Sequence, residues 1–290
     1  MPAIAIHGTT SNAGKTIIAT ALCRIFADKG YSATPFKAQN MSLNSYVTKD
    51  GGEIARAQAL QAHAARIEPT VDINPILLKP KAEHVSQVVV HGRPYADMNV
   101  GEYHDFIERQ GRQIVKTSLE YLLSEYDLVI MEGAGSPAEI NIMHRDIVNI
   151  YPARLAEAKC ILVHNIEHGG SFAYLFGTLG LLEDEKERYE GVIINKFHGE
   201  SLDTSDIERV IGKPVLGVVP YIEDLNLPEE DSLGLKNHDG HFDAPPVRKA
   251  ILQAMKRPSK TIERDLDDEI DRLANIVSAS VDIERTEAAL

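Results

Sequence analysis

A glycine-rich loop between a strand-like run and a helical pattern constrains this chain more than any other feature. The loop GTTSNAGKT covers residues 8–16 and directly follows the apolar run AIAIH at residues 3–7. Residues 14–29 then carry apolar side chains at i, i+4 and i+8 spacing, which predicts an amphipathic helix. A strand, a loop with Gly-Lys-Thr and a helix, in that order, are typical of a phosphate-binding P-loop, whereas a glycine turn without a ligand is the alternative.

The loop predicts how ATP and Mg²⁺ would be held. Backbone N–H groups of such a loop point inward at phosphate oxygens, and the dipole of the following helix favours the negative charge. Lys15 is expected to reach the β- and γ-phosphates, and the Thr16 hydroxyl is expected to coordinate Mg²⁺. The other loop residues predicted to contact the nucleotide are Gly8, Thr9, Ser11, Asn12, Ala13 and Gly14.

The spacing within the loop narrows the class of nucleotide-binding protein. Five residues separate Gly8 from Gly14, where the common P-loop has four. This longer loop argues against the kinase and GTPase families but not against nucleotide binding. Thr9, Thr10 and Ser11 stand where ParA/MinD-type ATPases carry an additional lysine, so the sequence also argues against a partitioning ATPase.

Alternating strand and helix patterns predict the fold class. Further apolar, β-branched runs occur at residues 32–36, 127–131, 160–165, 191–195 and 214–220. Such nearly continuous runs are typical of strands that are covered on both faces. Helical patterns at 53–66 and 104–125 lie between them. We therefore predict an α/β protein of the P-loop NTPase type, with a doubly wound, mostly parallel sheet and helices on both faces.

Three segments depart from this alternation. Residues 69–100 contain the dipeptides Asn74-Pro75 and Lys79-Pro80 and the run VSQVVVHG at 85–92. This pattern predicts a loop with a small β excursion near the nucleotide site. Residues 223–246 are predicted to form a long loop or linker. A helix is expected over 262–283, with an apolar stripe formed by Leu266, Ile270, Leu273, Ala274 and Val277. We divide the chain into a synthetase domain, 1–240, and a linker with a helical appendage, 241–290.

The composition of the chain restricts the kinds of molecule that it is expected to bind. The chain has 290 residues and a net charge of -13, which argues against nucleic acid or an anionic membrane as the main partner. Neither a signal-peptide pattern nor an apolar run of the ~18 residues needed to span a bilayer is found, so a cytoplasmic location is expected. Cys23 and Cys160 lie in apolar runs, and we interpret both as buried thiols.

Polar residues follow several predicted strands, at the sheet edge where the P-loop should lie. Glu132 ends the run DLVIM and is expected to make a second Mg²⁺ contact. Lys37 follows the second predicted strand. Together with the amide side chains after it, Lys37 provides hydrogen-bond donors suited to a carboxylate or a phosphate. Glu53 is either a further metal ligand or an acid at a helix start favoured by the dipole. Asn195, followed by Lys196, either hydrogen-bonds adenine or belongs to an ordinary strand-end turn.

Long motifs in the same order resemble the synthetase domain of the cobyric acid synthase family. The resemblance runs from about residue 3 to about residue 237, and more distantly extends to dethiobiotin synthetase and cobyrinic acid a,c-diamide synthase. The motifs are GTTSNAGKT, PFKAQNMSLNS, GGEIARAQALQA, NPILLKP, YHDF, YDLVIMEGAGSPAEIN, RDIVN and GVIINKF.

The resemblance implies an ATP-dependent amidation of peripheral carboxylates of a corrinoid, adenosylcobyrinic acid a,c-diamide. ATP would phosphorylate a carboxylate, and ammonia would displace phosphate from the acyl phosphate. Lys15, Lys37 and Glu132 would be catalytic, and Thr16, Glu53 and Glu132 would hold the metal. The residues expected to contact or orient the substrate are Gln39, Asn40, Ser136, Glu139 and Asn141.

One departure from the family concerns the ammonia. Full-length members carry a glutaminase domain with a nucleophilic Cys in a Gly-rich elbow, and neither Cys23 nor Cys160 lies in such an elbow. Residues 266–284 resemble the closing helix of those enzymes. We therefore expect free ammonia or a separate glutaminase subunit as the donor, and a homodimer is plausible. The alternatives are a dethiobiotin synthetase-like ligase, which carboxylates a diamine and closes a ring, and a regulatory P-loop protein without catalytic activity.

Overall fold

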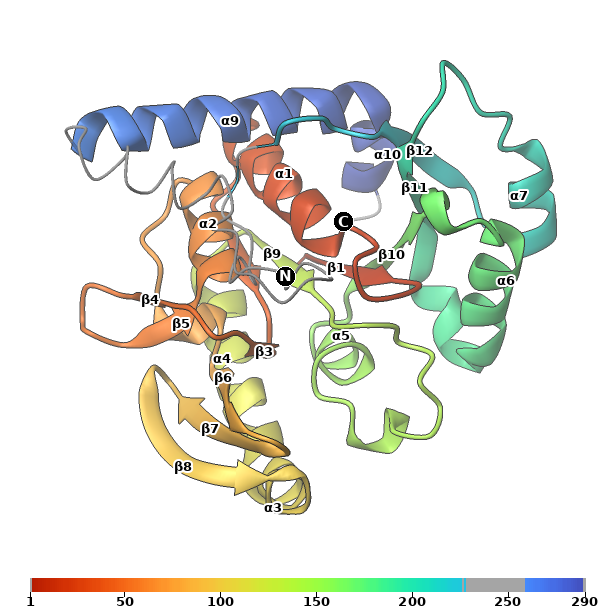
Figure 1. Ribbon diagram of the computed structural model, residues 1–290. Coiled ribbons are helices and arrows are strands. Elements are labelled where there is room, and N and C mark those ends of the chain that lie inside the picture. Colours follow the sequence, from red (N-terminus) through yellow and green to blue (C-terminus); the bar gives the residue numbers. More distant parts are fainter. Residues whose placement is uncertain (1, 226, 228–258, 289–290) are drawn as a thin grey trace, which may run out of the picture.

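A six-stranded parallel sheet forms the centre of the computed structural model, which describes residues 2–225, 227 and 259–288 (Figure 1). The strand order is β12-β11-β10-β1-β9-β2, and every pairing is parallel. All six runs predicted as strands lie in this sheet, so the predicted fold class is confirmed. The strands are β1 Ala3–Gly8, β2 Ala33–Phe36, β9 Leu128–Glu132, β10 Lys159–Asn165, β11 Tyr189–Phe197 and β12 Val215–Pro220.

Helices cover both faces of the sheet because its strands are apolar on both sides. In β1, Ile4 and Ile6 face one core cluster, and Ala3 and Ala5 face the other. The first face is covered by α1 Lys15–Asp28, α9 Ser259–Ser280 and α10 Ile283–Ala288, with α2 Arg56–Ala64 beside α1. The second face is covered by α4 Arg112–Glu125, α5 Ile150–Leu155, α6 Ser171–Leu181 and α7 Ser205–Ile211. Short 3-10 turns lie at Val71–Ile73, Met143–Arg145, Ile166–His168 and Glu183–Arg188.

The β excursion predicted within residues 69–100 is larger than expected, because it forms most of a second sheet. Its order is β3-β6-β7-β8, with β3 Gln39–Met41, β6 Ile76–Ala82, β7 Val85–Val90 and β8 Arg93–Asn99. The sequence predicted only β7, because the exposed half of β6 and most of β8 lack an apolar pattern. The predicted linker at 223–246 lies almost entirely outside the described residues.

The predicted helix over 53–66 is wrong at its first turn. Glu53–Ala55 forms strand β5, which pairs antiparallel with β4 (Ser45–Val47), and α2 begins only at Arg56. The register places Tyr46 opposite Ile54, and Ile54 is fully buried. Burial of this side chain against a partner strand outweighs the local helical pattern.

The helix predicted over 104–125 begins earlier than expected. Asn99 caps α3 (Val100–Phe106), because its side chain accepts hydrogen bonds from the backbone N–H groups of Gly101 and Glu102. The Glu102 carboxylate accepts in return from Asn99 N, which completes a capping box. A π-helical turn, Ile107–Gly111, joins α3 to α4.

The C-terminal helix α9 packs across α1, as the apolar stripe predicted. Ile270, Leu273, Ala274 and Val277 are all buried in the core shared with α1. Arg24 of α1 is also fully buried, and its guanidinium pairs with Asp267 at 2.6 Å. In the parts of the chain that the structure describes, no helix is long and apolar enough to cross a membrane.

The α9 contact gives a stability test. Leu273→Ala removes a fully buried side chain, so we expect the free energy of unfolding to fall by about 2–5 kcal/mol in urea titrations. Asn275→Ala, at an exposed position of the same helix, is the matched control and should change it by less than about 0.5 kcal/mol. Equal effects of the two substitutions would contradict the docking of α9 on α1.

Candidate functional site

The P-loop lies at the carboxyl edge of the sheet, between β1 and α1. Gly14 has a φ of 99°, and a Cβ on it would lie 1.9 Å from Asn195 Nδ2. The left-handed backbone and the close approach of Asn195 therefore both require glycine here. Asn12, with a φ of 61°, is the second left-handed residue of the loop, and Asn tolerates this conformation better than most residues.

A buried carboxylate, that of Glu132, joins the P-loop to two other segments. Its Oε1 accepts hydrogen bonds from Thr16 Oγ1 at 2.8 Å and from Lys37 Nζ at 2.9 Å. Its Oε2 accepts from Gln61 Nε2 at 2.6 Å and from Gln58 Nε2 at 3.3 Å. Three residues predicted from separate motifs thus meet in one cluster, which we call the Glu132 cluster: Glu132, Thr16, Lys37, Gln58 and Gln61.

Electrostatics keep this carboxylate ionised. Burial raises the pKa of Glu132, but the charge of Lys37 and the hydrogen bonds from Lys37, Gln61 and Thr16 outweigh burial, so the net pKa is lowered. Both side chains of the Lys37–Glu132 pair are almost completely buried. The site therefore presents a fixed negative charge with a paired cation beside the P-loop.

Lys15 and Thr9 connect the P-loop to its surroundings. Lys15 Nζ donates to Thr10 O at 3.0 Å and to Gly135 O at 2.9 Å, so it bridges the P-loop and the loop after β9. Thr9 Oγ1 lies 2.9 Å from His164 Nδ1. Burial, and then the neighbouring His168, lower the pKa of His164 to about 4, so it is neutral near pH 7.

Asn195 supports the P-loop from β11. Its Nδ2 donates to Ala13 O at 3.0 Å, and its Oδ1 accepts from Lys196 N at 2.9 Å. Lys196 Nζ lies 3.2 Å from Glu167 Oε2. A carboxamide has two donor hydrogens and two acceptor lone pairs, so these bonds leave Asn195 with further capacity for hydrogen bonds.

Glu53, predicted as a metal ligand, lies on the β4–β5 ribbon. Its Oε2 accepts from Lys79 Nζ at 2.5 Å and from Ser45 Oγ at 2.7 Å. These two hydrogen bonds, that of Lys79 first, lower the pKa of Glu53. The described residues contain no group of three or more His, Cys, Asp or Glu side chains that could hold a metal ion.

The predicted substrate residues lie on strand β3 and on the loop after β9, two segments that both contact α3. Gln39 accepts from Tyr103 Oη at 2.6 Å, whereas Asn40 is buried and donates to Gln58 Oε1 at 2.8 Å. The loop after β9 carries Ser136, Glu139 and Asn141, and the last two are exposed. Arg145, at the end of this loop, lies 2.9 Å from His104 Nδ1, next to Tyr103. Adjacent residues of α3 therefore contact both segments.

Two groups of polar residues were not predicted from the sequence. Gln61 and Gln58 lie on α2 and hold Glu132, and their place in the motif GGEIARAQALQA was the available signal. Asn149 and Asp146 hold the loop after β9 through Ala134. They belong to the motif RDIVN, so their conspicuous position in a matching motif was the available signal.

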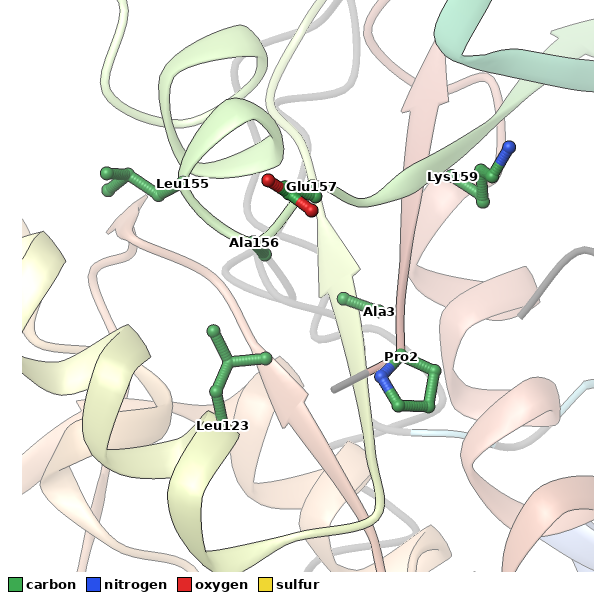
Figure 2. A pocket seen from close by; sticks show the side chains of 7 residues that line it. All are labelled: Pro2, Ala3, Leu123, Leu155, Ala156, Glu157 and Lys159. Atoms are coloured by element: carbon green, nitrogen blue, oxygen red, sulfur yellow. The ribbon is translucent and has the colours of Figure 1, made fainter.

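A hollow lies at the opposite edge of the sheet (Figure 2). Pro2, Ala3, Leu123, Leu155 and Lys159 are among the residues that line it. Ala3 and Lys159 begin β1 and β10, whereas the P-loop follows the other end of β1. This hollow is therefore separate from the Glu132 cluster.

Comparisons with known proteins match most of the chain. The family described as CobQ/CobB/MinD/ParA nucleotide binding domain matches residues 4–234. The chain is 54% identical over 240 residues to the cobyric acid synthase of Geobacillus sp. (strain WCH70), covering 80% of this chain and 47% of that protein. It is 54% identical over 242 residues to the probable cobyric acid synthase of Methanocaldococcus jannaschii, covering 81% of this chain and 48% of that protein. The chain thus spans about half the length of these relatives.

A solved structure resembles the fold at low sequence identity. The ParA family ATPase from Chlorobium tepidum TLS is 14% identical, covers 77% of this chain and 85% of that one, and gives a TM-score of 0.47.

The lowered pKa of Glu132 predicts how stability depends on pH. A carboxyl group with a folded-state pKa below its ordinary 4.5 stabilises the fold above about pH 4.5, and this contribution is lost as the pH falls through the lower value. The wild type should therefore exceed Glu132→Gln in unfolding free energy near pH 7. Urea titrations at decreasing pH should show that the difference shrinks below about pH 4.5. A difference that stays constant or grows would mean that Glu132 is not stabilised as an anion.

Proposed function

Because the chain belongs to the CobQ/CobB/MinD/ParA nucleotide-binding domain family, we propose that it is an ATP-dependent amidoligase acting on a corrinoid. The proposed substrate is adenosylcobyrinic acid a,c-diamide, whose peripheral carboxylates would be converted to amides. Its similarity to cobyric acid synthases supports the substrate class. The observation that carries the proposal is the Glu132 cluster, which places a buried lysine and a carboxylate beside the P-loop.

In the proposed reaction, a substrate carboxylate oxygen attacks the γ-phosphorus of ATP and ADP leaves, giving an acyl phosphate. Ammonia then attacks the acyl carbon, phosphate leaves and the amide remains after loss of a proton. Lys15 would neutralise the β- and γ-phosphates. Lys37 would neutralise charge where the carboxylate approaches the γ-phosphate. Such a site acts mainly through positioning and electrostatic stabilisation, and the preformed cluster provides both.

Mg²⁺ fits the oxygen donors beside the P-loop. Thr16 Oγ1 and Glu132 Oε1 lie 2.8 Å apart, and hydroxyl and carboxylate oxygens together with phosphates are the usual Mg²⁺ ligands. Bound there, Mg²⁺ would withdraw charge from the phosphate oxygens. We further propose that Glu53 contributes to metal binding once it is released from Lys79. Asn195 and Lys196 would contact the adenine base with the hydrogen-bonding capacity that the P-loop contacts leave.

The two segments that contact α3 form the proposed acid-binding site. Gln39 and Asn40 come from the segment that begins with β3, and Ser136, Glu139 and Asn141 from the loop after β9. Exposed apolar side chains accompany both: Met41 and Leu43 on the first, and Ile140 and Ile142 on the second. An amphipathic macrocycle with carboxylates at its periphery suits such a mixture of polar and apolar groups.

We propose that these 290 residues use ammonia rather than glutamine. Hydrolysis of glutamine would require a reactive thiolate. Cys23 and Cys160 are both fully buried, and burial raises the pKa of the Cys160 thiol to about 12. Neither thiol is therefore suited to act as a nucleophile, and ammonia would come from solution or from a separate glutaminase.

The direct test is phosphate release with product analysis by mass. We expect ATP turnover only when adenosylcobyrinic acid a,c-diamide and ammonium are both present, with product gaining one amide at a time, and no product with glutamine in place of ammonium. Lys15→Met is the inactive control. Turnover with a diamine and bicarbonate would instead indicate a dethiobiotin synthetase-like ligase. ATP binding without acid-dependent turnover would indicate a regulatory nucleotide-binding protein.

A pair of variants separates the two roles of Glu53. If Glu53 binds the metal, Glu53→Gln should raise the Mg²⁺ concentration for half-maximal turnover by roughly tenfold. A tenfold change corresponds to about 1.4 kcal/mol, which is the order of magnitude of one charge-assisted contact. Lys79→Met removes its ion-pair partner and should leave this concentration unchanged or lower it. The same increase in both variants would show that Glu53 acts only through its ion pair.

A further inference from the structure

The side chain of Asn149 binds the backbone of the loop after β9. Its Oδ1 accepts from Ala134 N, and its Nδ2 donates to Ala134 O, both at 3.0 Å. The carboxamide thus satisfies the backbone donor and acceptor of one residue, as a neighbouring strand would. Asn149 is only 7% exposed, so water competes little for these two hydrogen bonds.

Asn149 is itself fixed from several sides. The Asp146 carboxylate accepts from Asn149 N at 2.9 Å and from Asn149 Nδ2 at 3.2 Å. The same carboxylate accepts from Tyr151 N at 3.0 Å, which ties Asn149 to the first turn of α5. A Cβ on Gly133 would lie 2.2 Å from Asn149 Oδ1 and 2.7 Å from the His7 ring. Glycine at this position therefore lets the carboxamide approach the loop.

The anchored loop joins three parts of the site. Glu132, at its start, is the centre of the Glu132 cluster. Gly135, one residue beyond the anchored Ala134, accepts a hydrogen bond from Lys15 Nζ at 2.9 Å. Ser136 then begins the proposed acid-binding loop. A shift of Ala134 would therefore move the contact with the P-loop lysine and the start of the acid-binding loop together.

We propose that Asn149 is a positioning residue that fixes residues 133–135 across the mouth of the P-loop, and so sets the distance between the acid substrate and the nucleotide. The tether itself is independent of the reaction, whereas its effect on turnover rests on the proposed function. The P-loop has its own supports, because Asn195 donates to the Ala13 carbonyl and His164 contacts the Thr9 hydroxyl. Loss of Asn149 should therefore impair turnover more than nucleotide binding.

Two variants test the tether through different chemistry. Asn149→Ala removes both hydrogen bonds, and we expect acid-dependent turnover to fall about tenfold or more, while the Kd for Mg-ATP changes by less than about threefold. Asn149→Asp keeps an acceptor for Ala134 N but, when ionised, cannot donate to Ala134 O. Burial and the neighbouring Asp146 raise the pKa of the introduced carboxyl. Since the protonated acid regains a donor, turnover of Asn149→Asp relative to wild type should recover as the pH is lowered from about 8 to about 6.

A second measurement does not depend on the reaction. Amide hydrogen exchange in residues 133–135 should accelerate about tenfold or more in Asn149→Ala, because Ala134 N loses its acceptor. The matched control is Thr286→Ala, which removes the hydroxyl of a buried residue of α10 that donates to Asp282 O, outside the residues assigned to the site. It should change neither turnover nor this exchange.

The outcomes separate the two proposals. Unchanged exchange in Asn149→Ala would overturn the tether whatever the enzyme does. Faster exchange with turnover within about twofold of wild type, or a wild-type pH profile for Asn149→Asp, would overturn the positioning role. If the wild type shows no acid-dependent turnover, the proposed function fails, and the exchange rates alone decide whether Asn149 holds the loop.

Discussion

The buried, ionised carboxylate of Glu132 is the interaction on which the arrangement of the site depends. An isolated carboxylate in this position would be costly, so each of its oxygens must receive hydrogen bonds. Those bonds come from Thr16 on α1, from Lys37 after β2 and from Gln61 on α2. The strand order supports this meeting, because β9 lies between β1 and β2 and all three strands end at the same edge. The P-loop, Lys37 and Glu132 are therefore neighbours as a direct consequence of the parallel topology.

Residues of the segment 69–100, which lies outside the main sheet, also help to place Lys37. Lys37 N donates to Ile73 O at 2.9 Å, and Asn74 Nδ2 donates to Lys37 O at 3.0 Å. The same Asn74 accepts from Ala55 N, at the start of α2. One buried carboxamide thus fixes the segments that deliver Lys37 and Gln61 to Glu132. Ile73 and Asn74, near the start of the segment 69–100, therefore support the backbone of Lys37.

What the sequence could predict follows from how local each signal is. The six strands and the P-loop were predictable because an apolar run or a glycine spacing is readable within a few residues. Glu132 and Lys37 followed from the rule that parallel strands end at one edge. The roles of Gln61 and Asn149 followed from no local pattern, since a neutral carboxamide acquires its role only from tertiary partners. The assignment of Glu53 to a helix start was wrong because tertiary contacts decide its environment. Glu53 lies in the β4–β5 ribbon and pairs with Lys79.

The polar groups of the site already bind one another, and this affects how a nucleotide would be recognised. Lys15 donates to Gly135, Thr16 to Glu132 and Asn195 to Ala13. Phosphates and Mg²⁺ would therefore exchange existing hydrogen bonds for new ones, rather than satisfy groups left without partners. Such an exchange costs little, because each donor passes from one satisfied state to another. The same exchange would release the Gly135 carbonyl from Lys15. The two hydrogen bonds between Asn149 and Ala134 would then remain to fix the start of the loop that leads to the proposed acid-binding residues.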